Sequence, residues 1–280
     1  LSPMPAPLSV PAAMPRFQPW AQAPDEALRS LRGVLTDIDD TLTCEGAIEP
    51  AALAALHRLS EAGVPVIAIT GRPAGWSEPC VTGWPVRAVV AENGGVLLQR
   101  SGDGGVLREF TVEPRERAAR CQRLQACATE ILATVPGANL ATDSPGRLTD
   151  IAVDHSEHAR LDAAGIDAAL ACMRRHGLTA TVSSIHVNGW IGEHSKWSGA
   201  HWAVQRALGR AFDPAEWLYV GDSTNDQLMF ERVPVSVGVA NIARFVPQLA
   251  VLPAWVTAAE RGRGFAEVAQ RLLAARAGRR

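Results

Sequence analysis

Two groups of acidic residues in this sequence have a spacing that suits chemistry on a charged substrate. Asp37 and Asp39 lie two residues apart at the end of the apolar run 31–37. In an extended segment, side chains at i and i+2 project to the same side, so both carboxylates can face one substrate and one cation. The second group lies in 221–226, Gly-Asp-Ser-Thr-Asn-Asp, directly after the apolar run 217–220. Both groups therefore follow a predicted strand, where an α/β sheet places its chemistry.

Each group also has a purely structural explanation. An acidic turn can cap the segment after Asp39, and Ser223 or Thr224 can cap the helix that follows. Asp226 can favour the positive N-terminal end of that helix. None of these roles explains why a buried strand should end in Asp222 as well.

Two further positions suit the binding of an anion. Thr70 and Gly71 follow the apolar run 64–69, and a hydroxyl with backbone amides at a strand-to-helix turn forms an anion cradle. A simple turn that uses Gly71 is the alternative. Lys196 is the only lysine among 27 basic residues. An arginine-dominated chain that keeps one lysine indicates a need for a compact ammonium, and a solvated surface lysine is the alternative.

The elements that must position these residues alternate between buried strands and helices. Short apolar runs predict strands at 31–37, 64–69, 88–91, 217–220, 235–239 and 255–257. Helices are predicted at 50–62, 196–208 and 225–232, and a last helix after the strand 255–257 is predicted to end at residue 275. The first of them has Pro50 in its first turn and Gly63 just after its end. This alternation predicts the α/β fold class, with a parallel sheet covered by helices.

The pattern changes in the middle of the chain. Strands at 96–98 and 106–110 flank a glycine-rich turn, which predicts a hairpin. Helices are then predicted at 114–134 and 158–175, with strands at 148–153, 178–183 and 185–190. Helices grouped with hairpin-like strands predict a small α+β module inserted into the parallel one.

The joint order of these features is more specific than any one of them. Along the chain, Asp-x-Asp follows one strand, Thr follows the next, a Lys comes later, and Gly-Asp-x-x-Asn-Asp follows a further strand. This order of motifs resembles the haloacid dehalogenase superfamily of phosphohydrolases. The place of the insert, between the second and third motifs, and Asn93-Gly94 resemble subfamily IIB, the subgroup with a large α/β cap. That subgroup includes Cof-like, sucrose-phosphate and trehalose-phosphate phosphatases. The resemblance covers 31–280 and implies a Rossmann-like core with an inserted α+β cap.

The domain boundaries follow from this resemblance and from composition. Residues 1–28 are a Pro-rich N-terminal lead-in without periodicity, which we expect to be disordered. Residues 29–98 and 191–280 are predicted to form the catalytic core, and 99–190 the cap that selects the substrate.

The resemblance also implies roles in catalysis. Asp37 matches the nucleophile that forms an aspartyl-phosphate, and a carboxylate is ionised and ready for this at neutral pH. Asp39 matches the acid and base that protonates the leaving alkoxide and then takes a proton from water. Dehalogenases of the superfamily lack this second carboxylate, so its presence favours a phosphatase. Lys196 would neutralise both the nucleophile and the transferred group.

A cation and a phosphate cradle are implied as well. Oxygen ligands without His or Cys nearby favour Mg²⁺. The implied metal residues are Asp37, Asp39 through its backbone carbonyl, Asp222, and Asp226 acting through water or by holding Lys196. The implied phosphate-binding residues are Thr70, Gly71, Lys196 and Asn225. Asp40 stands where many relatives carry Gly or Asn, and we assign it no catalytic role.

Contacts to the leaving group are expected from the cap. His186 and Asn188 lie on one face of a predicted strand, and their polar groups would suit a sugar hydroxyl. A solvated face of an ordinary sheet is the alternative.

Composition limits the classes of partner and the compartment. A formal net charge of −2 over 280 residues argues against a protein that binds nucleic acid or an anionic membrane. No apolar run spans a bilayer and no signal peptide is recognised. Five scattered cysteines without a Cys-x-x-Cys pair predict neither a disulfide framework nor a zinc site. We therefore expect a cytoplasmic protein, a monomer or small homo-oligomer.

The sequence thus predicts a Mg²⁺-dependent phosphomonoesterase that acts on a small phosphorylated metabolite, a sugar phosphate being the expected class. A sugar phosphomutase would use the same aspartyl-phosphate and stays open as an alternative. A non-catalytic binding protein is a further alternative, but such a protein has no physical need for so many mutually repelling carboxylates.

Overall fold

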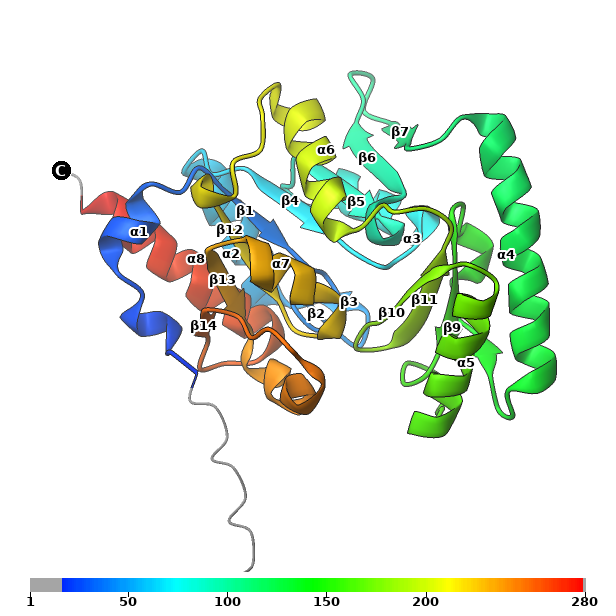
Figure 1. The fold of residues 1–280 in the computed structure, drawn as a ribbon. Coiled ribbons are helices and arrows are strands. Elements are labelled where there is room, and N and C mark those ends of the chain that lie inside the picture. Colours follow the sequence, from blue (N-terminus) through cyan, green and yellow to red (C-terminus); the bar gives the residue numbers. More distant parts are fainter. Residues whose placement is uncertain (1–16, 279–280) are drawn as a thin grey trace, which may run out of the picture.

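The computed structural model describes residues 17–278 and contains an eight-stranded, a four-stranded and a two-stranded sheet (Figure 1). The large sheet contains β1 (Gly33–Thr36), β4 (Val66–Ile69), β5 (Ala88–Ala91), β6 (Val96–Arg100), β7 (Val106–Phe110), β12 (Trp217–Gly221), β13 (Val235–Gly238) and β14 (Trp255–Val256). Their spatial order is β14-β13-β12-β1-β4-β5-β6-β7, parallel from β14 to β5 and antiparallel beyond. This confirms the predicted α/β fold class.

Helices cover both faces of the large sheet. One face packs against α1 (Asp25–Arg29), α2 (Pro50–Glu61), α3 (Ala74–Gly83) and α8 (Arg261–Ala277), and the other against α6 (Lys196–Leu208) and α7 (Gln227–Arg232). The strands are apolar on both sides, because successive side chains point to opposite faces. In β1, Val34 packs with α2 and α8, and Leu35 packs with α6 and α7.

A smaller unit, residues 114–190, packs beside the large sheet, and we call it the cap (Figure 1). It contains α4 (Pro114–Thr134), β8 (Asn139–Leu140), β9 (Asp150–Asp154), α5 (Ala163–Arg175), β10 (Thr179–Val182) and β11 (His186–Trp190). The strands pair antiparallel in the order β10-β11-β9-β8. Both helices pack on this sheet around a hydrophobic cluster separate from the two of the core.

The hairpin predicted before the cap belongs to the large sheet. β6 pairs antiparallel with β5 and β7 pairs with β6, so the strand 106–110, which we expected in the cap, extends the core instead. Val106 and Phe110 pack against the hydrophobic core on the α3 side. A local turn signal predicts a hairpin but does not say which sheet it joins.

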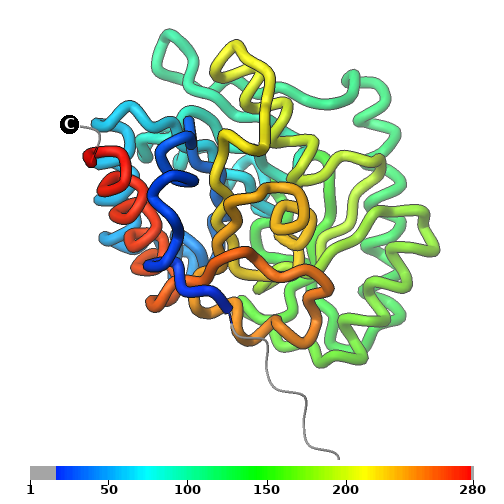
Figure 2. The backbone as a smooth tube through the Cα atoms, turned by 60° about the vertical axis from the view of Figure 1, so that its left-hand side comes forward, coloured from blue at the N-terminus to red at the C-terminus, as the bar shows by residue number. Residues whose placement is uncertain are grey.

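The N-terminal lead-in is corrected in part. Residues 1–16 lie outside the described residues, but 17–28 are packed on the core beside α8 (Figure 2). Trp20 is 2 % exposed, and its indole Nε1 donates to the Glu267 carbonyl oxygen at 3.2 Å. Trp20 and Leu28 supply apolar anchors that the proline content of this segment hides.

The remaining elements are short. The two-stranded sheet pairs β2 (Thr43–Cys44) with β3 (Ala47–Ile48). The 3₁₀ helices are η1 (Trp20–Gln22), η2 (Glu92–Gly94), η3 (Ser144–Gly146), η4 (Pro214–Glu216), η5 (Thr224–Asp226) and η6 (Ala240–Gln248). Within 17–278, no helix is long and apolar enough to cross a membrane.

Candidate active site

The predicted site residues meet at one edge of the large sheet. Asp37 follows β1, Thr70 follows β4 and Asp222 follows β12, and these three strands are neighbours in the order β12-β1-β4. Because the strands are parallel, their carboxyl ends lie at the same edge and the three side chains converge. Lys196 is the first residue of α6, which begins with a capping box between Ser195 and Ser198.

A buried ion-pair cluster joins Lys196 to two carboxylates. The Lys196 Nζ lies 2.6 Å from Asp37 Oδ1 and 2.6 Å from Asp226 Oδ1, and the lysine is 3 % exposed. The Tyr219 hydroxyl also donates to Asp226 Oδ1. Burial alone would lower the pKa of Lys196, but the two carboxylates outweigh it and raise this pKa, so the ammonium stays charged.

Asp226 is fully occupied by protein donors. Its Oδ2 accepts from the backbone N–H groups of Asp222 at 2.8 Å and Ser223 at 3.1 Å. The carboxylate folds back so closely that a Cβ at Gly221 would lie 2.5 Å from Asp226 Cγ, which explains the glycine there. Of the two roles that the family resemblance implies for Asp226, this geometry supports holding Lys196.

The other two acids, Asp37 and Asp222, fit a hard divalent cation. Their carboxylate oxygens lie within 4.8 Å of each other and of Asp226, whose own oxygens accept from protein donors. Asp222 Oδ1 is buried and has no hydrogen-bond partner among the described residues, while its Oδ2 accepts from Asn241 Nδ2 at 3.1 Å. An orphaned buried carboxylate oxygen among further oxygen donors is what a Mg²⁺ site requires.

The pKa values of these acids give the same indication. Burial, together with the nearby carboxylates of Asp226 and Asp39, raises the pKa of Asp37 to about 8, although the charge of Lys196 acts to lower it. Burial and the nearby carboxylates raise the pKa of Asp222 well above its ordinary value. One lysine therefore does not balance this cluster, and a divalent cation would favour the ionised forms.

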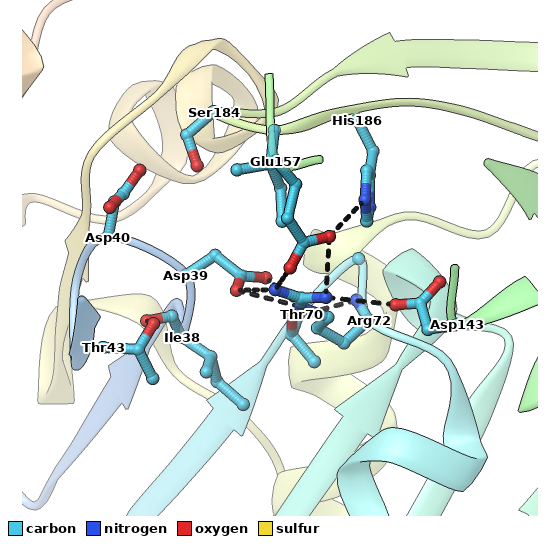
Figure 3. A network of polar contacts seen from close by, with 12 residues as sticks. Ile38, Asp39, Asp40, Thr43, Thr70, Arg72, Asp143, Glu157, Ser184 and His186 are labelled. Carbon is cyan, nitrogen blue, oxygen red and sulfur yellow. Dashed lines mark hydrogen bonds and ion pairs between the residues drawn. The ribbon is translucent and has the colours of Figure 1, made fainter. Parts of the chain in front are cut away.

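Asp39 is held by an arginine that also contacts the cap. Arg72 Nε lies 2.9 and 3.0 Å from the two Asp39 oxygens, and the arginine is 3 % exposed. Its other nitrogens donate to Glu157 Oε1 at 2.6 Å and to Asp143 Oδ2 at 3.2 Å, both in the cap (Figure 3). We call these four residues the Arg72 clamp; it joins the predicted acid/base to the cap.

Arg72 and Glu157 of the clamp are charged at neutral pH. The carboxylates of Asp39 and Glu157 raise the pKa of Arg72 although its burial opposes this. Burial would raise the pKa of Glu157, but hydrogen bonds from His186 and Arg72 lower it to about 2. The cap is therefore fixed to the core by ion pairs that water screens weakly.

His186 and Asn188 lie on one face of β11 and point to the core, but both take part in contacts between protein groups. His186 Nε2 lies 2.9 Å from Glu157 Oε2, and Asn188 Nδ2 lies 3.2 Å from Asp150 Oδ2 and 3.4 Å from the Gly71 carbonyl oxygen. Their exposed fractions are 2 % and 1 %. In this arrangement Asn188 contacts the core and His186 holds Glu157 within the cap, and neither lines the cavity beside Asp39.

That cavity, with a volume of about 600 Å³, lies between the core and the cap. Asp39 and Arg72 form part of its core wall, and Ser156, Arg160 and Ser184 form part of its cap wall. The Ser184 hydroxyl is buried without a hydrogen-bond partner among residues 17–278, and it points toward the space above Asp39 (Figure 3). The volume suits a small metabolite.

Asp40 faces the rim of the same cavity. It adopts the left-handed conformation with φ 55° and accepts from Arg244 at 2.7 Å and from Arg261 Nε at 2.9 Å. The departure from the family pattern at position 40 thus anchors two arginines at the cavity entrance.

The predicted phosphate-binding residues surround Asp37. Thr70 is buried, and its Oγ1 accepts from the Arg72 backbone N–H at 3.0 Å. Asn225 Oδ1 lies 3.4 Å from Lys196 Nζ. The side chains of Arg72 and Glu157 were not predicted as part of the site. Arg72 directly follows the Thr70-Gly71 motif, whereas no sequence signal marks Glu157.

A family profile described as haloacid dehalogenase-like hydrolase matches residues 34–116, the segment that contains Asp37, Asp39 and Thr70. Over this segment the chain is similar to haloacid dehalogenase-like hydrolases. The cap lies between Thr70 and Lys196 in the chain, which is the place that the resemblance to subfamily IIB implies. No curated protein matches it in sequence.

Solved structures share this haloacid dehalogenase fold over nearly their whole length. A protein of Thermoplasma acidophilum matches with a TM-score of 0.64 and 19% identity over 87% of this chain and 98% of the other. The C-terminal domain of a C. albicans trehalose-6-phosphate phosphatase matches with a TM-score of 0.64 and 13% identity over 94% of this chain and 99% of the other. The sucrose-phosphatase of Synechocystis matches with a TM-score of 0.61 and 15% identity over 87% and 98%.

Proposed function

We propose that this protein is a Mg²⁺-dependent phosphomonoesterase that hydrolyses a small phosphorylated metabolite, with sugar phosphates as the expected class. The proposal rests chiefly on the buried Lys196, 2.6 Å from Asp37, among carboxylates that a cation would complete. The sugar-phosphate class is supported by the similar fold of a trehalose-6-phosphate phosphatase and a sucrose-phosphatase.

In the first half-reaction, an Asp37 carboxylate oxygen attacks phosphorus and the ester P–O bond breaks. Lys196 offsets negative charge on Asp37 and on the transferred group, and it is positioned for this by Asp226. Asp39, protonated at this stage, gives its proton to the leaving alkoxide. The products are an aspartyl-phosphate and a free alcohol.

In the second half-reaction, the Asp39 carboxylate takes a proton from water, and the water oxygen attacks phosphorus. The bond between phosphorus and the Asp37 oxygen breaks, which restores the Asp37 carboxylate and releases phosphate. Bound Mg²⁺, held by Asp37, Asp222 and the Asp39 backbone carbonyl, would supply charge neutralisation for the phosphoryl group.

The leaving group would occupy the cavity between core and cap. Ser184 offers a buried hydroxyl to it, and Arg160 offers a guanidinium at the cap wall. These cap residues are better placed for substrate contact than His186 and Asn188, which are bonded to protein groups.

The proposal is tested by phosphate release from a panel of phosphorylated metabolites, with Mg²⁺ and with EDTA. We expect metal-dependent turnover that falls by about a thousandfold or more in Asp37→Asn, because the nucleophile is lost. Thr224→Ala, outside the proposed chemistry, is the matched control.

Two results would redirect the proposal. Transfer of the phosphoryl group between sugar positions, with free phosphate released only slowly, would indicate the mutase. Wild-type turnover in Asp37→Asn would overturn the assigned nucleophile.

A further inference from the structure

The cap contains a second group of metal-binding side chains, apart from the catalytic edge. Cys127 and Cys172, on the adjacent helices α4 and α5, and His176, which ends α5, offer Sγ and ring nitrogen atoms that all lie within 4.8 Å of one another. Glu130 joins them, because its Oε2 lies 2.7 Å from His176 Nε2. These four side chains are called the cap cluster below.

The spacing of the cap cluster follows from helix geometry. Cys127 and Glu130 are three residues apart on α4, and Cys172 and His176 are four apart on α5, so each pair lies on one helix face. The two helices pack side by side on the cap sheet (Figure 1). Two ligands from each of two packed helices make a compact set of four donors.

The cap cluster combines buried thiols with a polar opening. Cys127 is 0 % and Cys172 is 1 % exposed, whereas the side chains of His176 and Glu130 are 26 % and 39 % exposed. The thiols therefore face the interior of the cap and the other two donors lie at its surface. An ion would have an entry path from solvent past His176 and Glu130.

We propose that the cap cluster binds one Zn²⁺ ion. Two soft thiolates and a borderline imidazole, completed by one carboxylate, form a four-coordinate donor set, and its sulfur and nitrogen ligands select zinc over Mg²⁺. Zn²⁺ displaces one proton from each thiol, so two protons are released and the bound site carries one net negative charge. This inference does not depend on the proposed phosphatase activity.

The required movement is small. In a tetrahedral site with bonds of about 2.3 Å to sulfur and about 2.0 Å to nitrogen, neighbouring ligand atoms lie about 3.3–3.8 Å apart. From separations of at most 4.8 Å, the Cys127, Cys172 and His176 atoms need to approach by about 1.5 Å or less. Glu130 Oε2 has to exchange its 2.7 Å hydrogen bond with His176 for the ion, while its Oε1 accepts from Arg175. Side-chain rotation on two helix faces can supply this without moving the helices.

The role of such an ion would be structural. The Cys127 thiol comes from α4 and the Cys172 thiol from α5, so an ion that both bind would lie between the two helices. A bound ion would connect α4 to α5 and so stabilise the unit that carries Asp143 and Glu157 of the Arg72 clamp.

The experiment uses the full chain, purified under reducing conditions without chelator, with zinc content measured by mass spectrometry. We expect one Zn²⁺ per chain. After replacement by Co²⁺, we expect a thiolate-to-metal absorption band in the near ultraviolet, which the carboxylates of the catalytic site cannot produce. Cys127→Ser should abolish the band, and Cys121→Ser, at an exposed cysteine of the same helix, should leave it intact.

Partly exposed ligands keep the test valid if a buried cysteine variant fails to fold. His176→Ala and Glu130→Gln should each weaken Zn²⁺ binding at least tenfold while turnover changes less than twofold. Zinc content below one-tenth per chain with no thiolate band would overturn the proposal. A disulfide between Cys127 and Cys172 in the freshly purified protein, detected by peptide mass, would also overturn it.

Discussion

The catalytic edge and the cap cluster both gather side chains that suit a metal ion, but they are built in different ways. At the catalytic edge, Asp37 and Asp222 lie in loops after strands, and the parallel pairing of β1 with β12 sets their separation. In the cap cluster, Cys127 and Cys172 come from helix faces, and the packing of α4 on α5 sets theirs. In a sheet, backbone hydrogen bonds between strands fix the positions of the loops that follow. In a helix pair, side-chain packing fixes the positions of residues on the helix faces.

The two regions also differ in the chemistry of their donors. The catalytic edge offers hard oxygen atoms around a buried ammonium, and the cap cluster offers sulfur and nitrogen. Substitutions in one region should therefore leave the metal bound by the other unchanged, which makes the regions separable by experiment.

The largest effect is expected from loss of the catalytic ammonium. Lys196→Ala removes the cation that contacts Asp37 and Asp226, so kcat should fall by about 10²–10³-fold. Lys196→Arg keeps the charge but replaces a compact ammonium by a planar fork, and it should stay about tenfold or more below wild type. Steady-state kinetics measures both, and zinc content should not change. Full activity in the arginine variant would show that charge alone suffices.

A smaller effect on turnover is expected from the Arg72 clamp. Arg72→Ala leaves Asp39, Asp143 and Glu157 without their shared cation. The free energy of unfolding should fall by about 3 kcal/mol, because buried charges are left unpaired. The kcat value should fall by about tenfold, since Asp39 loses its orientation. Urea unfolding and steady-state kinetics test the two effects, with Arg115→Ala, at an exposed arginine of α4, as control. An unchanged kcat would mean that the clamp serves stability alone.

The smallest effect is a difference in acid stability. The pKa of Glu157 is about 2 in the folded protein against an ordinary 4.5, so its ionised form stabilises the fold above pH 4.5 and this contribution is lost as pH falls toward 2. Glu157→Gln should therefore be less stable by about 1–2 kcal/mol at pH 7, and this difference should shrink between pH 4.5 and 2. Denaturant unfolding at a series of pH values measures it.

Glu130 in the cap cluster provides the matched comparison for this experiment. Hydrogen bonds from His176 and Arg175 lower its pKa to about 2 as well, but the carboxylate is exposed to solvent. In metal-free protein, Glu130→Gln should therefore show a weaker pH-dependent loss than Glu157→Gln. Equal losses would show that burial in the clamp adds nothing to the ion pair.

The sequence determined the elements whose patterns are local. The helices predicted at 114–134 and 196–208 are confirmed as α4 and α6, because apolar spacing, a first-turn proline and a terminal glycine are read within one element. The order of strands and motifs also placed Asp37, Thr70 and Asp222 at one sheet edge. The helix α3 was not predicted, since Gly75 and Pro79 inside it weaken its pattern.

The tertiary structure alone decided which distant residues meet. Arg72 reaches Glu157 across 85 residues of chain, and Cys127 reaches Cys172 although no Cys-x-x-Cys pair marks either. The hairpin strand 106–110 likewise joined the core and not the cap. Periodicity reports how each segment buries its own apolar face, but pairing between segments depends on how those faces pack together. A one-dimensional pattern does not contain that information.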